Sequence, residues 1–247
     1  MIKYFSDTCN VLSRIEPVQE FPFPWAASGD CLPYDIYREL SATRPNLKRE
    51  GEEGNNKRLD VRGRDLLKAD FLAPIWKDFV GYHTSQDFYH QILDRFEYYF
   101  AEFYPQLKNM RDYKAGVRFG EEADIYLDCQ LSVNTPVKIK STVATPHVDN
   151  PESLWASLLY MREEGDDSGG DFVLHKCVKS PTFTGKRHAD LDCIRPWGNV
   201  LYEPNHYVCF INSPLSIHSV TEREVTDKRR MMVNITLEFK DKQLFKV

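Results

Sequence analysis

The spacing of hydrophobic residues predicts two helices in the first part of the chain. Apolar positions recur at helical intervals in residues 33–43, where Pro33 suits a first helical turn and Asp30 is a candidate cap. A longer helix is expected after residue 84, because Thr84 and Asp87 have the spacing of a capping box. Its apolar stripe has the periodicity of core packing and consists of Phe88, Ile92, Phe96, Tyr99, Phe100 and Phe103.

A change of pattern follows at Tyr113, where short β-rich runs separated by turn residues begin. The expected strands lie at 115–119, 125–133, 154–161, 172–174, 207–212, 216–221 and 231–239. The charged segment 48–64 is expected to be a solvated loop, with a mobile lid as the alternative.

Many short strands preceded by helices predict an α+β fold with a mainly β core. We expect a double-stranded β-helix, or jelly roll, buttressed by N-terminal helices. The 247 residues are expected to form a single domain, with helical support in 1–112 and the jelly-roll core in 113–240.

Composition narrows the range of partners. A net charge of −5 without a basic stripe disfavours nucleic acid, and no apolar run is long enough to span a membrane. The six cysteines include no C-x-x-C pair, which disfavours a zinc knuckle or a disulfide framework. A cytoplasmic protein is therefore expected.

A candidate metal site begins at His147-Val148-Asp149. In an extended segment residues i and i+2 project to the same side, so His147 and Asp149 can bind one metal ion, and a distant histidine can complete the site. Two imidazoles and one carboxylate are the ligand set of non-haem iron(II) oxygenases. His218, in a run of β-forming residues, is the candidate third ligand.

The His-x-Asp motif alone has little value, because chance produces it often. A second copy, His188-Ala189-Asp190, lies in a polar run and is expected to be a surface loop. His147-Val148-Asp149 instead leads directly into an apolar strand, which favours this copy.

The last expected strand contains a candidate cation that could bind the carboxylate of a ligand. Alternation along the last strand groups Arg230 with Met232, Asn234 and Thr236, and leaves an apolar face on the other side. A guanidinium binds a carboxylate bidentately, so Arg230 is preferred to Arg229 as an anchor. Surface charges at the start of a strand are the alternative interpretation.

Together these residues resemble the 2-oxoglutarate and iron(II) dependent oxygenases of the prolyl-4-hydroxylase type, including the hypoxia-sensing enzymes. The resemblance spans about residues 113–239 and includes, in the family's order, His147-Val148-Asp149-Asn150-Pro151, Leu158-Leu159-Tyr160-Met161, Ser168-Gly169-Gly170-Asp171-Phe172, His218 and Arg230. Segments 21–24, 55–58 and 82–85 are similar to a group of small bacterial and phage oxygenases.

The chain departs from that pattern in two places. The gap from His218 to Arg230 is longer than in the hypoxia-sensing enzymes, so Arg229 stays an alternative. A tyrosine before the His-x-Asp strand is missing, and Gln130, Ser132 and Asn134 are its candidate substitutes, with Gln130 chosen as a cosubstrate contact beside Tyr160 and Arg230.

The resemblance implies a 2-oxoglutarate-dependent dioxygenase that uses Fe(II) and O2 to hydroxylate an unactivated C–H bond and releases succinate and CO2. The Asp149 ligand is expected to favour hydroxylation over halogenation. Oxidative desaturation or cyclisation, hydroxylation of a protein prolyl or other side chain, a cupin-type hydrolase or isomerase and a non-catalytic binding module are the alternatives. We expect a small-molecule substrate, such as an amino acid, a sugar or a natural-product intermediate.

Overall fold

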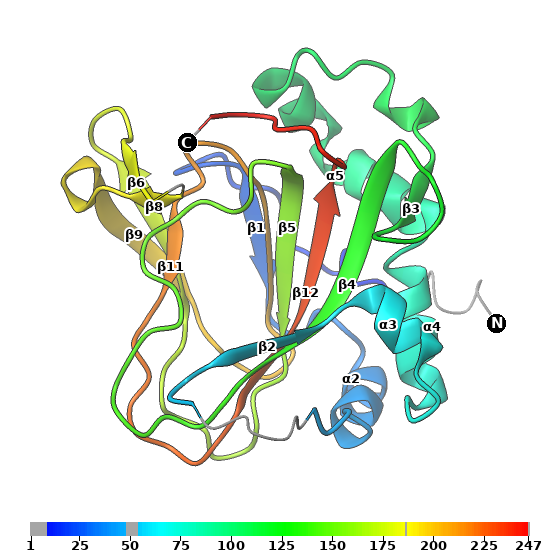
Figure 1. The fold of residues 1–247 in the computed structure, drawn as a ribbon, viewed down its shortest axis with the longest axis vertical. Coiled ribbons are helices and arrows are strands. Elements are labelled where there is room, and N and C mark those ends of the chain that lie inside the picture. The colour runs from blue at the N-terminus through cyan, green and yellow to red at the C-terminus, as the bar shows by residue number, and fades with distance from the viewer. Residues whose placement is uncertain (1–8, 48–53, 186, 247) are drawn as a thin grey trace.

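The computed structural model describes residues 9–47, 54–185 and 187–246. It has an α+β architecture in which helices cover one side of a large sheet and a smaller sheet lies on the other side (Figure 1). The helices are α2 (Tyr34–Ala42), α3 (Gly63–Lys68), α4 (Pro74–Tyr82) and α5 (Gln86–Phe103), with single 3-10 turns η1 (Met110–Asp112) and η2 (Leu191–Cys193).

The large sheet has seven strands and is antiparallel except at one edge. Its order is β1 (Trp25–Ser28), β10 (Tyr207–Ile211), β5 (Ser153–Tyr160), β12 (Arg230–Glu238), β4 (Ile125–Asn134) and β2 (Arg58–Val61), and β3 (Ala115–Val117) runs parallel to β4. The central strand, β12, pairs with β4 along its whole length and with β5 on its other side.

The smaller sheet faces the inner side of the large one. Its order is β11 (His218–Val220), β6 (Phe172–Cys177) and β9 (Ile194–Val200), and a hairpin of β7 (Phe183–Thr184) and β8 (His188–Ala189) lies beside it. Buried apolar residues join the two sheets, among them Phe172 from β6, Val200 from β9 and Phe210 from β10. The space between the sheets is therefore a second core.

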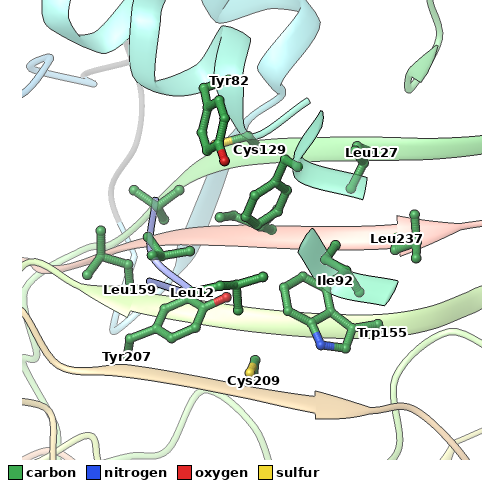
Figure 2. Close-up of a cluster of buried hydrophobic side chains, with 14 of the residues drawn as sticks. Leu12, Tyr82, Ile92, Leu127, Cys129, Trp155, Leu159, Tyr207, Cys209 and Leu237 are labelled. Carbon is green, nitrogen blue, oxygen red and sulfur yellow. The ribbon is translucent and has the colours of Figure 1, made fainter. Parts of the chain in front are cut away.

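The main core lies on the outer face of the large sheet. Side chains from α5, such as Ile92, pack onto strand residues such as Trp155 and Leu237 (Figure 2). Alternation along β12 sends Met231, Val233, Ile235 and Leu237 into this core. The opposite face of β12, which begins with Arg230, is consequently turned toward the smaller sheet.

The structure confirms the α+β class and most expected elements, and it corrects several details. The 48–64 segment is not a continuous loop, because β2 occupies Arg58–Val61 and α3 starts at Gly63; residues 48–53 lie outside the described ranges. Ser85, rather than Thr84, caps α5 by accepting a hydrogen bond from the Phe88 amide at 3.3 Å. No side chain caps α2, so the Asp30 cap is wrong.

Candidate functional site

Three side chains from two distant segments meet at one point of the inner face. His147 and Asp149 come from the loop before β5, and His218 is the first residue of β11. One ligand atom from each lies within 4.8 Å of the other two. The Asp149 Oδ1 atom is 3.8 Å from Nε2 of His147 and 3.7 Å from Nε2 of His218, a spacing that one shared metal ion would fit.

Backbone carbonyl groups orient both imidazoles. Nδ1 of His147 is bonded to the Thr145 carbonyl oxygen at 2.8 Å, and Nδ1 of His218 to the Ser216 carbonyl oxygen at 2.9 Å. Because a carbonyl oxygen can only accept, each Nδ1 bears a proton, and in the neutral ring Nε2 has the lone pair that a metal ion needs. This outer hydrogen bond is the arrangement that metal-binding histidines commonly have.

Backbone pairing brings the two segments together. His147 and His218 exchange two amide-to-carbonyl hydrogen bonds, each 2.9 Å long, so their side chains project from the same face. The His218 ring is also stacked on Phe172 and packed against Phe210. The third expected ligand is thus held by both main-chain and apolar contacts.

The electrostatics of His147 favour the form that binds metal. Burial, and then the nearby charge of His218, lower the pKa of His147 to about 4. Its imidazole is consequently neutral near pH 7, and a neutral imidazole is the species that binds a metal ion.

A cavity of about 70 Å³ connects the three side chains with Arg230. Arg58 and Asn234 give it one polar wall, while Ala156, Leu158, Phe172 and Phe210 give it an apolar one. A ligand in this cavity could contact the candidate metal ligands and a guanidinium at the same time.

Arg230 is a buried cation without a described counter-anion. Its side chain is bonded through Nε to the Gly170 carbonyl oxygen at 3.0 Å and through Nη1 to Met232 Sδ at 3.2 Å, and only 1% of the residue is exposed. Nη2 has no hydrogen-bond partner, and within the described ranges no carboxylate forms an ion pair with Arg230. A buried charge is costly unless an anion neutralises it, so this pocket suits a carboxylate.

Tyr160 lies beside this guanidinium. The Arg230 guanidinium carbon is 5.3 Å from the ring centre of Tyr160 and 4.9 Å from that of Tyr202. The Tyr160 hydroxyl is buried and makes no hydrogen bond of ordinary geometry, and burial raises its pKa well above the ordinary value although the adjacent Arg230 guanidinium opposes this rise. Tyr160 therefore offers a neutral hydroxyl donor next to Arg230.

Of the other candidate residues, Arg229 and Gln130 lie away from the site, and Asn134 lies opposite Arg230. Arg229 points to the other side of the sheet, where it donates to the Leu47 carbonyl oxygen at 2.9 Å. Gln130 donates to Asp128 at 2.7 Å and does not line the cavity, so the structure does not bring it to the site. Asn134 has the same facing as Gln130 but lies directly opposite Arg230, and neither amide atom of its buried side chain has a partner.

A buried ion pair that the sequence did not indicate supports the Arg230 pocket. Arg223 is fully buried and contacts Asp166 Oδ2 at 3.3 Å and Ser168 Oγ at 3.0 Å. These contacts fix the turn at Gly170, whose φ is +98° and whose added Cβ would lie 2.9 Å from Arg230 Nε. The Ser-Gly-Gly motif marked this turn, but no local pattern linked it to Arg223.

The second His-x-Asp motif has two separate roles. Asp190 caps η2 by accepting a hydrogen bond from the Asp192 amide at 3.1 Å, so its carboxylate is part of a turn. His188 is exposed, but it lies in strand β8 rather than in a loop, and its ring centre is 6.2 Å from that of His147. The expected surface location of His188 is correct, whereas its assignment to a loop is wrong.

No family model and no curated protein matches the sequence. Among solved structures, the non-haem α-ketoglutarate dependent epimerase SnoN from nogalamycin biosynthesis has a TM-score of 0.51 and 11% identity, over 87% of this chain and 78% of that one. The chain shares the fold of SnoN.

Two further structures resemble the chain more loosely. AviO1 from Streptomyces viridochromogenes Tue57 covers 98% of both chains with a TM-score of 0.48 and 12% identity. A prolyl-4-hydroxylase from Pseudomonas putida covers 88% of both with a TM-score of 0.42 and 14% identity. At the level of the fold, the SnoN match agrees with the oxygenase resemblance seen in the sequence.

Within the described ranges, no helix is both long enough and apolar enough to cross a membrane.

Proposed function

We propose that this protein is a 2-oxoglutarate-dependent non-haem iron(II) oxygenase, with His147, Asp149 and His218 as metal ligands. The observation that best supports the proposal is the cavity shared by these ligands and the unneutralised Arg230 guanidinium. In this proposal the two facing sheets are the halves of a double-stranded β-helix, and the chain acts as a single domain.

The side chains present suit the metal and the cosubstrate. Two imidazole Nε2 atoms and one carboxylate would hold the ferrous ion and would leave room for the cosubstrate and O2. Arg230 Nη2 and the Tyr160 hydroxyl are neighbouring buried donors without a hydrogen bond of ordinary geometry, and a distal carboxylate would accept from both. When bound, the ferrous ion would supply the redox chemistry that converts 2-oxoglutarate and O2 to succinate and CO2 while the substrate is oxidised.

The protein residues would bind and orient the reactants. Arg230 would set the position of the cosubstrate along the cavity, and the apolar wall formed by Leu158, Phe172 and Phe210 would exclude water from the reacting region. We favour a small-molecule substrate, of which one end enters the cavity. Hydroxylation of a C–H bond is the reaction we favour.

A screen for substrate-stimulated succinate release tests this proposal. The protein, loaded anaerobically with Fe(II), is exposed to O2 and 2-oxoglutarate with panels of amino acids, sugars and natural-product intermediates. We expect metal binding in a 1:1 ratio and slow succinate formation that a substrate accelerates. A product that gains one oxygen atom indicates hydroxylation, and one that loses two hydrogens indicates desaturation. Failure to bind Fe(II), or no consumption of 2-oxoglutarate, would refute the proposal.

A further inference from the structure

Three histidines form one row across three adjacent backbone segments. His147 lies in the middle and pairs in antiparallel register with His218 on one side and with His188 on the other. Directly opposed residues of antiparallel segments project from the same face. The ring centres agree with this, at 4.4 Å for His147 and His218 and 6.2 Å for His147 and His188.

The row leads outward from the candidate metal centre. The His218 side chain is 7% exposed, the His147 side chain is 16% exposed, and His188 is exposed. Two backbone hydrogen bonds fix the last step of the row, from the Val148 amide to the Arg187 carbonyl oxygen and from the Ala189 amide to the Pro146 carbonyl oxygen. His188 does not line the cavity itself; it lies on the exposed side of His147, on the same face as the ligands.

Thr145 orients two of these rings at once. Its carbonyl oxygen is bonded to Nδ1 of His147, and its hydroxyl oxygen is 3.0 Å from Nδ1 of His188. With the hydroxyl as donor, the neutral His188 ring has its proton on Nε2 and can donate it to an acceptor. His188 is not a member of the cluster of atoms within 4.8 Å, so it is not a fourth ligand in this arrangement.

We propose that His188 is a positioning residue, whose Nε2 hydrogen-bonds the group that occupies the open side of the metal centre. This inference rests on the proposed function, and it adds His188, from the second His-x-Asp motif, to the residues that would serve that function. During the reaction, this contact would orient the polar part of a substrate that lies outside the cavity, on the exposed side of His147. The simpler alternative is that His188 only anchors the hairpin of β7 and β8 through Thr145.

Cobalt(II) and azide test the proposal without a known substrate. Cobalt(II) replaces iron in such sites and reports its ligands through its visible spectrum, and azide is a small anion that occupies an open metal position. The dissociation constants of cobalt(II) and of azide are measured for the wild type and for His188→Phe, His188→Gln and Thr145→Val. His90→Phe is the matched control, because His90 lies in α5 and is bonded to Gln86.

We expect His188→Phe to weaken azide binding by about tenfold and to leave cobalt(II) affinity unchanged, because an anion then loses one hydrogen bond. His188→Gln should keep part of the azide affinity. Thr145→Val should resemble His188→Phe, because it removes the hydroxyl but keeps the carbonyl that orients His147. His90→Phe should behave as the wild type.

Equal azide affinities in the wild type and His188→Phe would overturn the proposal, as would the absence of saturable azide binding to the cobalt(II) protein. Failure of the wild type to bind cobalt(II), or a cobalt(II) spectrum that 2-oxoglutarate does not change, would instead refute the proposed function. The two failures are therefore distinguishable.

Discussion

Asn134 and Arg230 lie directly opposite each other on β4 and β12, and both have buried polar atoms without a hydrogen-bond partner. On the other side of β4, Arg58 of β2 also lies opposite Asn134, so Asn134 lies between Arg58 and Arg230 across three neighbouring strands. A fully buried amide with neither atom satisfied is uncommon. Asn134 does not line the cavity itself, but it lies beside Arg58 and Arg230, which both line it.

Substituting Asn134→Asp should stabilise the unliganded protein and weaken 2-oxoglutarate binding. The new carboxylate would neutralise Arg230, which raises the melting temperature by about 2–4 °C for each kcal/mol gained. It would also repel the distal carboxylate of the cosubstrate, and we expect at least a tenfold loss of affinity. Thermal melts with and without 2-oxoglutarate measure both effects. Asn134→Leu should lower affinity without the thermal gain, and an Asp variant that binds 2-oxoglutarate normally would contradict this assignment.

Arg230→Met should abolish most of the 2-oxoglutarate affinity without loss of stability. The substitution leaves the cosubstrate carboxylate without its charge partner, so the affinity for 2-oxoglutarate should fall by about a hundredfold or more. It also removes a buried charge that no described carboxylate neutralises, so the unliganded fold should not weaken. Arg229→Met is the control and should bind 2-oxoglutarate as the wild type does, because Arg229 contacts Leu47. The reverse ranking in a titration would show that Arg229 is the anchor.

Asp166→Asn should lower both stability and cosubstrate affinity. It leaves the fully buried Arg223 without a counter-charge, at a cost of roughly 3 kcal/mol in the free energy of unfolding. The Gly170 turn would then shift, and Arg230 would lose its Nε partner. Denaturant unfolding and the KM for 2-oxoglutarate are the measurements. The double variant Asp166→Asn with Arg223→Met should recover part of the stability, and a double variant weaker than Asp166→Asn would disprove the coupling.

Glu238 should make stability depend on pH. Burial raises its pKa from 4.5 to about 7, against the opposing effect of the Arg118 charge. Because the folded-state pKa of Glu238 lies above the unfolded value, the protonated carboxyl group favours the folded state. The contribution of this protonated group to stability is complete below about pH 4.5 and is lost as the pH rises through about 7. Glu238→Gln removes the dependence. Its stability relative to the wild type should increase between pH 5 and pH 8 by up to about 2 kcal/mol, and parallel pH curves from urea unfolding would count against this assignment.

Alanine at His147, Asp149 or His218 should abolish tight Fe(II) binding and cosubstrate turnover. Each substitution removes one of three ligands, and the remaining two cannot hold the ion in a fixed geometry. Asn150→Ala is the control, since Asn150 is exposed and adjacent to Asp149 but outside the cluster. Metal content after gel filtration is the readout. Full metal occupancy in any of the three ligand variants would remove that residue from the site.

Local patterns were sufficient for most of the longer strands and for the choice of the three candidate ligands, which the structure brings together. Alternation along 231–239 assigned the apolar face of β12 to the core, and the same alternation turned Arg230 inward. Strand β9 was missed because Pro196 and Gly198 are typical of turns, and β2 was missed because it is a short edge strand in a charged segment.

Local patterns do not predict which residues of different strands or segments lie opposite each other. Gln130 and Asn134 have the same facing on β4, and only the register with β12 places Asn134, rather than Gln130, opposite Arg230. The Arg223–Asp166 pair links residues 57 positions apart, and neither residue belongs to a periodic motif. His188 was assigned to a loop for the same reason, because its neighbour His147 is in another segment.

The shared Thr145 anchor has a thermodynamic consequence for the hairpin of β7 and β8. Because one residue orients His147 and His188, an ion that fixes the His147 ring also reduces the freedom of Thr145 and, through it, of the hairpin. Metal loading and ordering of the hairpin are then linked equilibria, and each favours the other. Slower hydrogen exchange at the Val148 and Ala189 amides after metal addition would be the sign of this linkage.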